Sequence, residues 1–256
     1  MSKIAEAFQD KKAFITYLMA GDPNLDQSAE NILAAQEAGA DLIEIGIPFS
    51  DPIAEGPVVE NASVRALSAG VRLNNVFDMV ASLQDQIHVP LVFMTYLNPV
   101  FVYGYDKFFA KCQEIGVSGI ILPDLPFEED NEVKVVANQY GIEVITLIAP
   151  TSKDRIKDVA KKAQGFIYLV SSMGVTGVRS NITTDISAMV AEIRAVSDIP
   201  VAVGFGINQP SQVRAIAAKA DGVIVGSGIV RLVEAHGNDA KSHIYDYVNE
   251  MQAALR

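Results

Sequence analysis

Short runs of β-branched and other apolar residues alternate with longer amphipathic segments from one end of the chain to the other. The apolar runs predict strands at residues 14–20, 41–47, 89–95, 118–124, 142–148, 165–171, 199–205 and 221–227. A strand followed by a helix, repeated about eight times in 256 residues without a linker rich in glycine, serine or proline, is typical of a parallel β/α barrel. We therefore predict one α/β domain at residues 1–256, folded as a TIM (β/α)8 barrel. An open doubly wound sheet is the alternative, because it shows the same alternation.

The amphipathic segments predict the helices between these strands. Clear examples cover residues 28–39, 128–141, 152–165, 183–197 and 210–220. A serine or threonine near the beginning of a segment is a candidate helix start, because its hydroxyl can accept a backbone N–H of the first turn. The candidates are Ser28, Ser152, Thr184 and Ser211.

The charge balance and the rare residue types exclude several functional classes. The net charge is −11, and nucleic acids and anionic membranes bind through basic surfaces, so we predict neither as the main partner. The first residues, MSKIAEAFQDKKAF, carry charges where a signal peptide is apolar, and no apolar run approaches the ~18 residues of a membrane span. We therefore expect a cytoplasmic protein. The single cysteine, Cys112, excludes an internal disulfide framework, and three scattered histidines predict no metal site.

The stretch DLIEIGIPFSDPIAEGP at residues 41–57 places a glutamate, Glu44, inside an otherwise apolar strand. Alternation along the strand sends Ile43 and Ile45 to one face and Glu44 to the other, which faces the interior of a barrel near its mouth. A structural alternative is a carboxylate neutralised by a nearby lysine or arginine, but residues 41–57 contain neither. We therefore favour a catalytic role for Glu44, because an unpaired buried carboxylate is costly.

Three glycine-rich loops follow the sixth, seventh and eighth predicted strands, at residues 171–177, 204–210 and 225–230. In TIM barrels a phosphate commonly binds between the last two of these loops, at the N-terminus of a short helix. The candidate residues are Gly204, Gly206, Gly226 and Ser227. Glycines that only form tight turns are the alternative, but three such loops on adjacent strands favour phosphate binding.

The positions of lysine and histidine narrow the chemistry of a phosphorylated substrate. A Schiff-base aldolase needs a lysine at the end of a strand, and every lysine here falls in a polar helix or loop segment. His88 precedes the third strand, at the wrong end of a barrel for a metal aldolase, while His236 and His243 follow the eighth strand. These positions disfavour both kinds of aldolase, so the sequence predicts general acid–base catalysis by carboxylates.

The motifs EIGIPFSDPIAEGP, YLVSSMGVTG, GFGI and VGSGIV, together with AGDP at 20–23, closely resemble those of the tryptophan synthase alpha chain, over essentially the whole length. The resemblance implies a lyase that cleaves indole-3-glycerol phosphate into indole and glyceraldehyde 3-phosphate. It also implies an α2β2 complex with a beta chain that carries pyridoxal phosphate and uses the indole to make tryptophan. No cofactor is implied in this chain.

The resemblance assigns two carboxylates to the reaction. The catalytic glutamate of the family falls on Glu44, which would protonate the ring carbon and remove the proton of the neighbouring hydroxyl. An apolar surrounding would raise its pKa and keep it protonated near neutral pH. The second carboxylate falls on Glu55, where the best-known enteric members have aspartate, and it would stabilise the positive charge on the ring nitrogen.

Other residues are assigned by the same resemblance to substrate binding. The phosphate site of the family falls on Gly177, Gly204, Phe205, Gly206, Gly226 and Ser227. The closing loop after the sixth strand carries Thr176, which would hold the Glu55 loop in place. Tyr168 matches the family's tyrosine near the carboxylates, whereas Tyr17 replaces a phenylalanine in the wall of the indole pocket. An ordinary core position is the alternative for both tyrosines.

The predicted partner interface lies on loops that end the second, third and fourth strands. It comprises Pro48, Asp51, Asn98, Pro99 and Asp124, because the family places the beta chain on this face. A simple turn is the alternative for the run NPVF at residues 98–101.

Three other functions remain open at the level of sequence. A sugar-phosphate isomerase could use the same barrel and phosphate site, since fold does not determine function. A regulatory subunit without activity is disfavoured by two retained carboxylates. A lyase that works alone and releases free indole is the third.

Overall fold

The structure is a computed structural model that describes residues 2–171, 185–204 and 206–255. Its strands are β1 (Ala13–Met19), β2 (Leu42–Gly46), β3 (Leu91–Met94), β4 (Gly119–Ile121), β5 (Glu143–Ile148), β6 (Ile167–Val170), β7 (Val201–Gly204) and β8 (Gly222–Val225). Each strand pairs in parallel with the next one in the chain, and β8 pairs with β1, so the sheet closes into a barrel. The predicted TIM barrel is confirmed, and the open doubly wound sheet is wrong.

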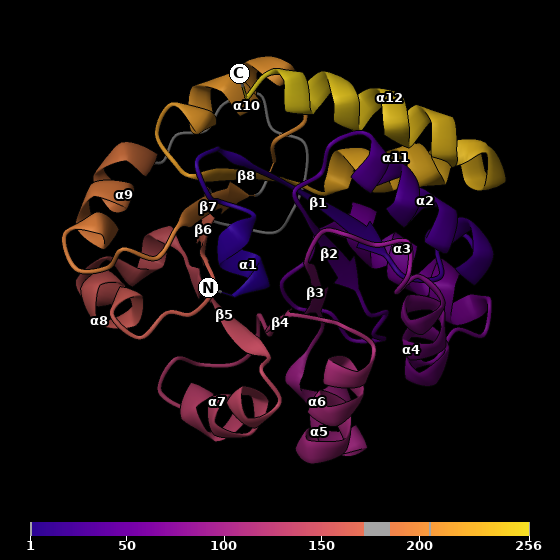
Figure 1. Cartoon of the computed structure of the whole chain (residues 1–256), viewed down its shortest axis with the longest axis horizontal. Coiled ribbons are helices and arrows are strands. Elements are labelled where there is room, and N and C mark those ends of the chain that lie inside the picture. The colour runs from indigo at the N-terminus through magenta and orange to yellow at the C-terminus, as the bar shows by residue number, and fades with distance from the viewer. Residues whose placement is uncertain (1, 172–184, 205, 256) are drawn as a thin grey trace.

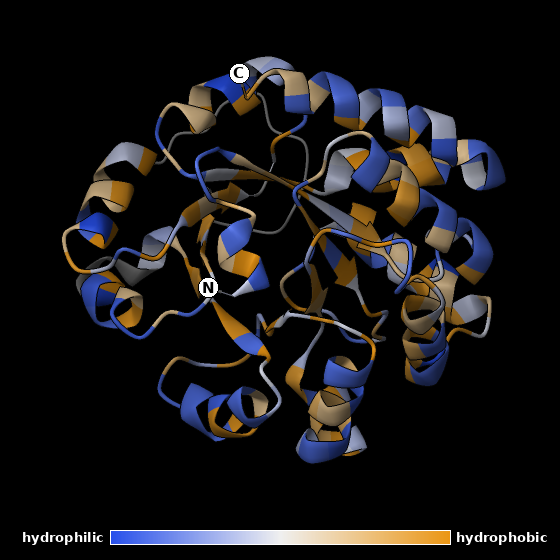
Figure 2. Cartoon of the chain, in the orientation of Figure 1, coloured by the Kyte–Doolittle hydropathy of each residue, from blue (hydrophilic) through white to orange (hydrophobic). Residues whose placement is uncertain are grey.

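Helices surround the barrel in a ring (Figure 1). They are α2 (Leu25–Glu37), α3 (Pro57–Ser68), α4 (Leu73–Ser82), α5 (Leu97–Tyr103), α6 (Tyr105–Glu114), α7 (Asp130–Gln139), α8 (Ile156–Ala160), α9 (Ile186–Arg194), α10 (Pro210–Ala217), α11 (Ser227–His236) and α12 (Ala240–Ala253). The short helix α1 (Lys3–Glu6) precedes the first strand. Short 3-10 helices precede α8 (Pro150–Arg155) and α12 (Gly237–Asp239). The strands in the centre are mostly hydrophobic, whereas the helices carry many hydrophilic residues among hydrophobic ones (Figure 2).

Several predicted helix starts are displaced. Helix α2 begins at Leu25, because the Asn24 side chain accepts the N–H of Gln27 at 2.9 Å, and Ser28 therefore lies within the helix. Helix α10 begins with Pro210 at its first position, one residue before Ser211. Ser152 lies inside the first 3-10 helix, and Thr184 lies outside the described residues.

The run NPVF forms part of helix α5, so the alternative of a simple turn is wrong. The N–H of Leu97, the first residue of α5, donates to both carboxylate oxygens of Asp124 at 2.9 and 3.1 Å. A carboxylate at a helix N-terminus is favourable, because the free N–H groups and the helix dipole point toward it. Asp124, in the loop after β4, thus fixes where α5 begins.

The two ends of the barrel differ in what occupies them. A β-carbon added to Gly119 would lie 2.9 Å from Ile4 Cδ1, and one added to Gly165 would lie 3.2 Å from Ile4 Cγ2. Helix α1, which carries Ile4, therefore packs against the strands where they begin, and it lies inside the ring of helices (Figure 1). The opposite end, where the strands finish and the βα loops begin, is available for a functional site.

None of the helices within the described residues is both long and apolar enough to cross a membrane.

Candidate active site

A cavity at the C-terminal ends of the strands gathers most of the catalytic and substrate-binding residues that the sequence predicts. Its lining comprises Tyr17, Glu44, Glu55, Val59, Met94, Tyr168, Gly206, Ile207, Ile224, Gly226 and Ser227. Tyr17 and Glu44 are register partners on β1 and β2, and alternation explains why both point inward. The structure thus brings together both carboxylates, both tyrosines and three of the glycine-loop residues.

Glu44 is buried in this cavity, and no charged side chain among the described residues pairs with it. It is 1% exposed, and within the described part of the chain its Oε1 atom has no hydrogen-bond partner. Burial raises the pKa of the Glu44 carboxyl from 4.5 to about 8, because the apolar surroundings disfavour the ionised form. Glu44 is therefore largely protonated at neutral pH, as a general acid must be.

Glu55 lies in the loop between β2 and α3, and Tyr96 holds it. The Tyr96 hydroxyl donates to Oε2 of Glu55. The Tyr96 hydroxyl oxygen in turn accepts the N–H groups of Ile53 and Ala54, each at 2.9 Å. Burial raises the pKa of Glu55 to about 7, backbone N–H groups lower it, and the charges of Asp124 and Glu60 raise it further. At neutral pH Glu55 is therefore more ionised than Glu44, so the two carboxyl groups are suited to different roles.

The sequence interpretation missed Tyr96. The signal that could have found it is its position two residues after the end of β3, on the same end of the barrel as the other candidates.

Each of the two tyrosines packs over a glycine of the neighbouring strand. A β-carbon added to Gly46 would lie 2.1 Å from the Tyr17 hydroxyl oxygen, and one added to Gly204 would lie 2.5 Å from that of Tyr168. Both rings are 5% exposed, and burial raises the pKa of both phenols well above the ordinary value, so they stay protonated. Gly204 thus makes room for Tyr168 and does not itself line the cavity.

The loops after β7 and β8 contribute Gly206, Gly226 and Ser227 to the cavity wall. Ser227 is the first residue of α11, so the free N–H groups of this helix begin at the cavity. Gly206 has a φ of 81°, which favours glycine, and a β-carbon added to Gly226 would lie 3.2 Å from Tyr17 Cβ. The three other residues assigned to this region, Thr176, Gly177 and Phe205, lie outside the described residues.

Replacing Gly206 by valine should weaken the binding of glycerol 3-phosphate at least about tenfold, because a left-handed backbone costs a residue with a β-carbon ~1–2 kcal/mol and the side chain obstructs the N–H groups. Isothermal titration calorimetry measures the affinity. Gly141→Val is the matched control: Gly141 also has a positive φ, 70°, and an added β-carbon there meets nothing within 4 Å. An unchanged affinity in folded Gly206→Val would place the phosphate elsewhere.

The predicted interface residues lie outside the cavity, and they differ in exposure. Asp51 and Asn98 are exposed, Pro99 and Asp124 are half-buried, and Pro48 is buried. Pro48 therefore offers little surface to a partner in this structure. Three large apolar side chains are exposed on the same loops and on α5: Phe101, which belongs to the predicted run NPVF, at 64%, and Ile53 at 72% and Val102 at 75%, which the sequence interpretation missed.

A larger cavity, of about 410 Å³, lies at the opposite end of the barrel. Charged residues line it, including Lys11 and Asp41, which form an ion pair. Asp41 also accepts the N–H of Phe14 at 2.8 Å, so its carboxylate fixes the start of β1. Elsewhere too, the described residues contain no cluster of three or more histidine, cysteine or acidic side chains that could hold a metal ion.

Comparison with known proteins identifies the family. Residues 4–256 match the family model described as "Tryptophan synthase alpha chain". The chain belongs to the tryptophan synthase alpha chain family. Among its relatives, the tryptophan synthase alpha chain of Lacticaseibacillus casei is 46% identical over 255 residues, which cover 100% of this chain and 96% of that protein. That of Lactiplantibacillus plantarum is 46% identical over 256 residues, covering 100% and 97%.

Solved structures agree with this assignment to the tryptophan synthase alpha chain family. A chain of Mycobacterium tuberculosis tryptophan synthase superposes with a TM-score of 0.90 at 34% identity, covering 100% of this chain and 98% of that one. A chain of the tryptophan synthase α2β2 complex from Pyrococcus furiosus gives 0.88 at 35% identity, covering 95% and 99%. The resemblance predicted from the motifs is confirmed, and the matched region includes every residue of the cavity.

Proposed function

We propose that this chain is the alpha chain of a tryptophan synthase, one catalytic domain at residues 1–256 that cleaves indole-3-glycerol phosphate into indole and glyceraldehyde 3-phosphate. The observation that carries the proposal is the pair of carboxylates in unlike surroundings, Glu44 and Glu55, which line one cavity. The cavity also reaches the N-terminus of α11, where an anion is stabilised.

Glu44 is the acid and the base of the proposed reaction. Its protonated carboxyl donates a proton to the ring carbon that bears the glycerol chain, which leaves a positive charge on the ring nitrogen. The resulting carboxylate then accepts the proton of the adjacent hydroxyl, the carbon–carbon bond breaks, and its electron pair returns to the ring. Indole and an aldehyde result, and Glu44 ends protonated as it began.

Glu55 stabilises the charge that develops on the ring nitrogen. Its carboxylate faces the same cavity as Glu44, and the contact with Tyr96 limits where it can move. An anion held in place before the charge develops needs little reorganisation during the reaction. Tyr17 and Tyr168 form apolar walls for the indole ring, and Gly206, Gly226 and Ser227 receive the phosphate.

The proposed partner is a beta chain that carries pyridoxal phosphate, in an α2β2 complex. Exposed apolar side chains are unfavourable in isolation, and Ile53, Phe101 and Val102 stand on loops and a helix at the same end of the barrel as the cavity. With Asp51, Asn98 and Pro99 they form the proposed docking surface. A partner there lies close to the cavity that releases indole. The reaction as written uses only side chains of this chain, so no cofactor is proposed for it.

The direct test is to mix the purified chain with indole-3-glycerol phosphate and to follow indole release, with and without a beta chain. We expect release by the chain alone and faster release in the complex. Isomerisation of a sugar phosphate without indole release would replace the proposed function with the isomerase alternative.

The pH dependence of kcat/KM should be bell-shaped, with its maximum between pH 7 and 8. The reaction needs Glu44 protonated, so activity is lost as the pH rises through its raised pKa of about 8. It needs Glu55 ionised, so activity is lost as the pH falls through about 7. Initial rates at substrate concentrations below KM measure this profile. In Glu55→Gln the acid limb should disappear, and its persistence would assign that limb to another group.

A further inference from the structure

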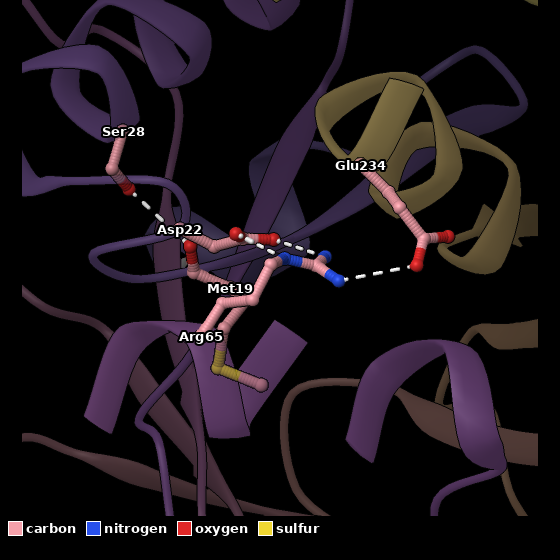
Figure 3. Close-up of polar contacts among 5 residues, drawn as sticks. All are labelled: Met19, Asp22, Ser28, Arg65 and Glu234. Carbon is pink, nitrogen blue, oxygen red and sulfur yellow. Dashed lines mark hydrogen bonds and ion pairs between the residues drawn. The ribbon is translucent and has the colours of Figure 1, made fainter. Parts of the chain in front are cut away.

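One guanidinium group joins three segments near the mouth of the barrel (Figure 3). The Arg65 side chain donates from Nε and Nη2 to the two carboxylate oxygens of Asp22, each at 2.8 Å, and from Nη1 to Oε1 of Glu234 at 3.3 Å. The side chain of Asp22 is 2% exposed and that of Glu234 is 48% exposed. The two-bonded pair with Asp22 is therefore the strong contact, because exposed ion pairs contribute little.

The three residues belong to segments that carry the cavity. Asp22 lies in the loop directly after β1, the strand that contains Tyr17. Arg65 lies in the last turn of α3, the helix that begins two residues after Glu55, and Glu234 lies in α11. A single side chain thus connects the Tyr17 strand, the helix next to the Glu55 loop and α11. Helix α11 begins at the proposed phosphate site, which we call the phosphate end of the cavity.

Other contacts show that the Glu55 loop follows the position of α3. The Ser63 hydroxyl in α3 donates to the carbonyl of Phe49 and accepts the N–H of Phe49, both at 2.8 Å, which fastens the start of the loop to the helix. Val59 in the first turn of α3 lines the cavity itself. On the other side, the Ser28 hydroxyl donates to the carbonyl of Met19 at 3.3 Å, which helps to fix the end of β1 (Figure 3).

Arginine is the residue type that this junction requires. Its planar fork makes two parallel bonds to one carboxylate, so it determines both the separation and the relative rotation of the segments it joins. A lysine would keep the charge, but its ammonium is a point charge without a fixed orientation. Neither Arg65 nor Asp22 lines the cavity, so neither contacts the substrate in its proposed place.

We propose that Arg65 and Asp22 are positioning residues for the lyase reaction. Their paired contact holds α3, and with it the Glu55 loop, at the distance from Tyr17 and from the phosphate end that the chemical step needs. This rests on the proposed function. Since a small displacement of a catalytic group is costly for turnover, loss of the pair should reduce the chemical step more than the binding of phosphate.

The test compares Arg65→Met and Arg65→Lys with the wild type. We expect kcat for indole release to fall at least about tenfold in both variants, because a misplaced carboxylate reacts poorly. The Kd for glycerol 3-phosphate should change less than about threefold, since α11 follows β8 directly and keeps its own place. Hydrogen exchange of the amides at residues 47–60 should accelerate at least about tenfold, because the loop loses its anchor.

Arg194→Met is the matched control. Arg194 donates from Nη2 to Oδ1 of Asp221 at 2.7 Å, and Asp221 directly precedes β8, at the end of the barrel away from the cavity. The kcat of the Arg194→Met variant and the rate of hydrogen exchange of its amides at residues 47–60 should stay within about twofold of the wild type. All variants are compared at a temperature where circular dichroism shows them folded, and Arg65→Lys decides if Arg65→Met does not fold.

Three results would overturn the positioning role: a kcat within about twofold of the wild type in a folded Arg65 variant, equal losses of kcat and phosphate affinity, or unchanged exchange at residues 47–60. A wild type that releases no indole, alone or with a beta chain, would instead overturn the proposed function. In that case the exchange at residues 47–60 alone decides whether the pair holds the loop.

Discussion

Glu44→Gln should lower the rate of indole release by about a thousandfold, because a general acid–base group commonly contributes 10²–10⁴. The amide fills nearly the same space as a protonated carboxyl group, so the cavity and its walls should persist. It cannot donate a proton to the ring carbon or accept one from the hydroxyl. Single-turnover measurements at saturating substrate report this step without interference from product release.

The control for Glu44→Gln is the affinity for glycerol 3-phosphate, which should stay within about threefold of the wild type. The proposed phosphate site belongs to the loops after β7 and β8, whereas Glu44 belongs to β2. The variant should also lose the alkaline limb of the pH profile in whatever activity remains, since the group with a pKa of about 8 is gone. Turnover near that of the wild type would exclude Glu44 as the acid–base group.

The period of the apolar pattern is what made the barrel and the place of Glu44 predictable. Eight strands with helical segments between them leave few folds open, and a period of two determines which face each strand residue occupies. The absence of lysine and arginine from residues 41–57 then indicated that the carboxylate is unpaired. In the structure Glu44 is buried and has no salt bridge within the described residues.

Features that depend on contacts between distant segments escaped the sequence interpretation. Tyr96 is 41 residues from Glu55 along the chain, and only the pairing of β2 with β3 brings their loops together. Arg65 and Asp22 are 43 residues apart for the same kind of reason. Gly204 belonged to a glycine pattern that suggests a phosphate loop, whereas its position opposite the Tyr168 ring depends on the register of β6 and β7.

Local capping also competed with the predicted helix boundaries. Asn24 and Ser28 are both good N-cap residues, and the structure uses Asn24, so that α2 begins one turn earlier than predicted. Which of two nearby caps is used depends on how the loop after β1 approaches the helix. That approach is determined by packing, which the spacing of apolar residues does not encode.

Glu55→Ala should lower kcat by roughly a hundredfold, because removing one preorganised electrostatic group commonly costs 10²–10³. Substrate should still bind through its phosphate, since the charge of Glu55 matters only once the ring is protonated. Glu55→Asp should keep part of the activity: the charge remains, but a carboxylate shorter by one methylene group cannot contact both Tyr96 and the ring nitrogen equally well. Steady-state kinetics with indole-3-glycerol phosphate measure kcat and KM for each variant.

Tyr96→Phe tests whether Glu55 must be held in place, because it leaves the carboxylate itself unchanged. It removes the hydroxyl that donates to Glu55 and accepts the N–H groups of Ile53 and Ala54, so the loop should lose its fixed place while the carboxylate itself remains. We expect an intermediate loss of kcat. Combined with Glu55→Ala it should cost less than the product of the two separate losses, because both changes disable one unit. Independent, multiplicative losses would mean that Tyr96 acts without Glu55, and a fully active Glu55→Ala would remove this carboxylate from the mechanism.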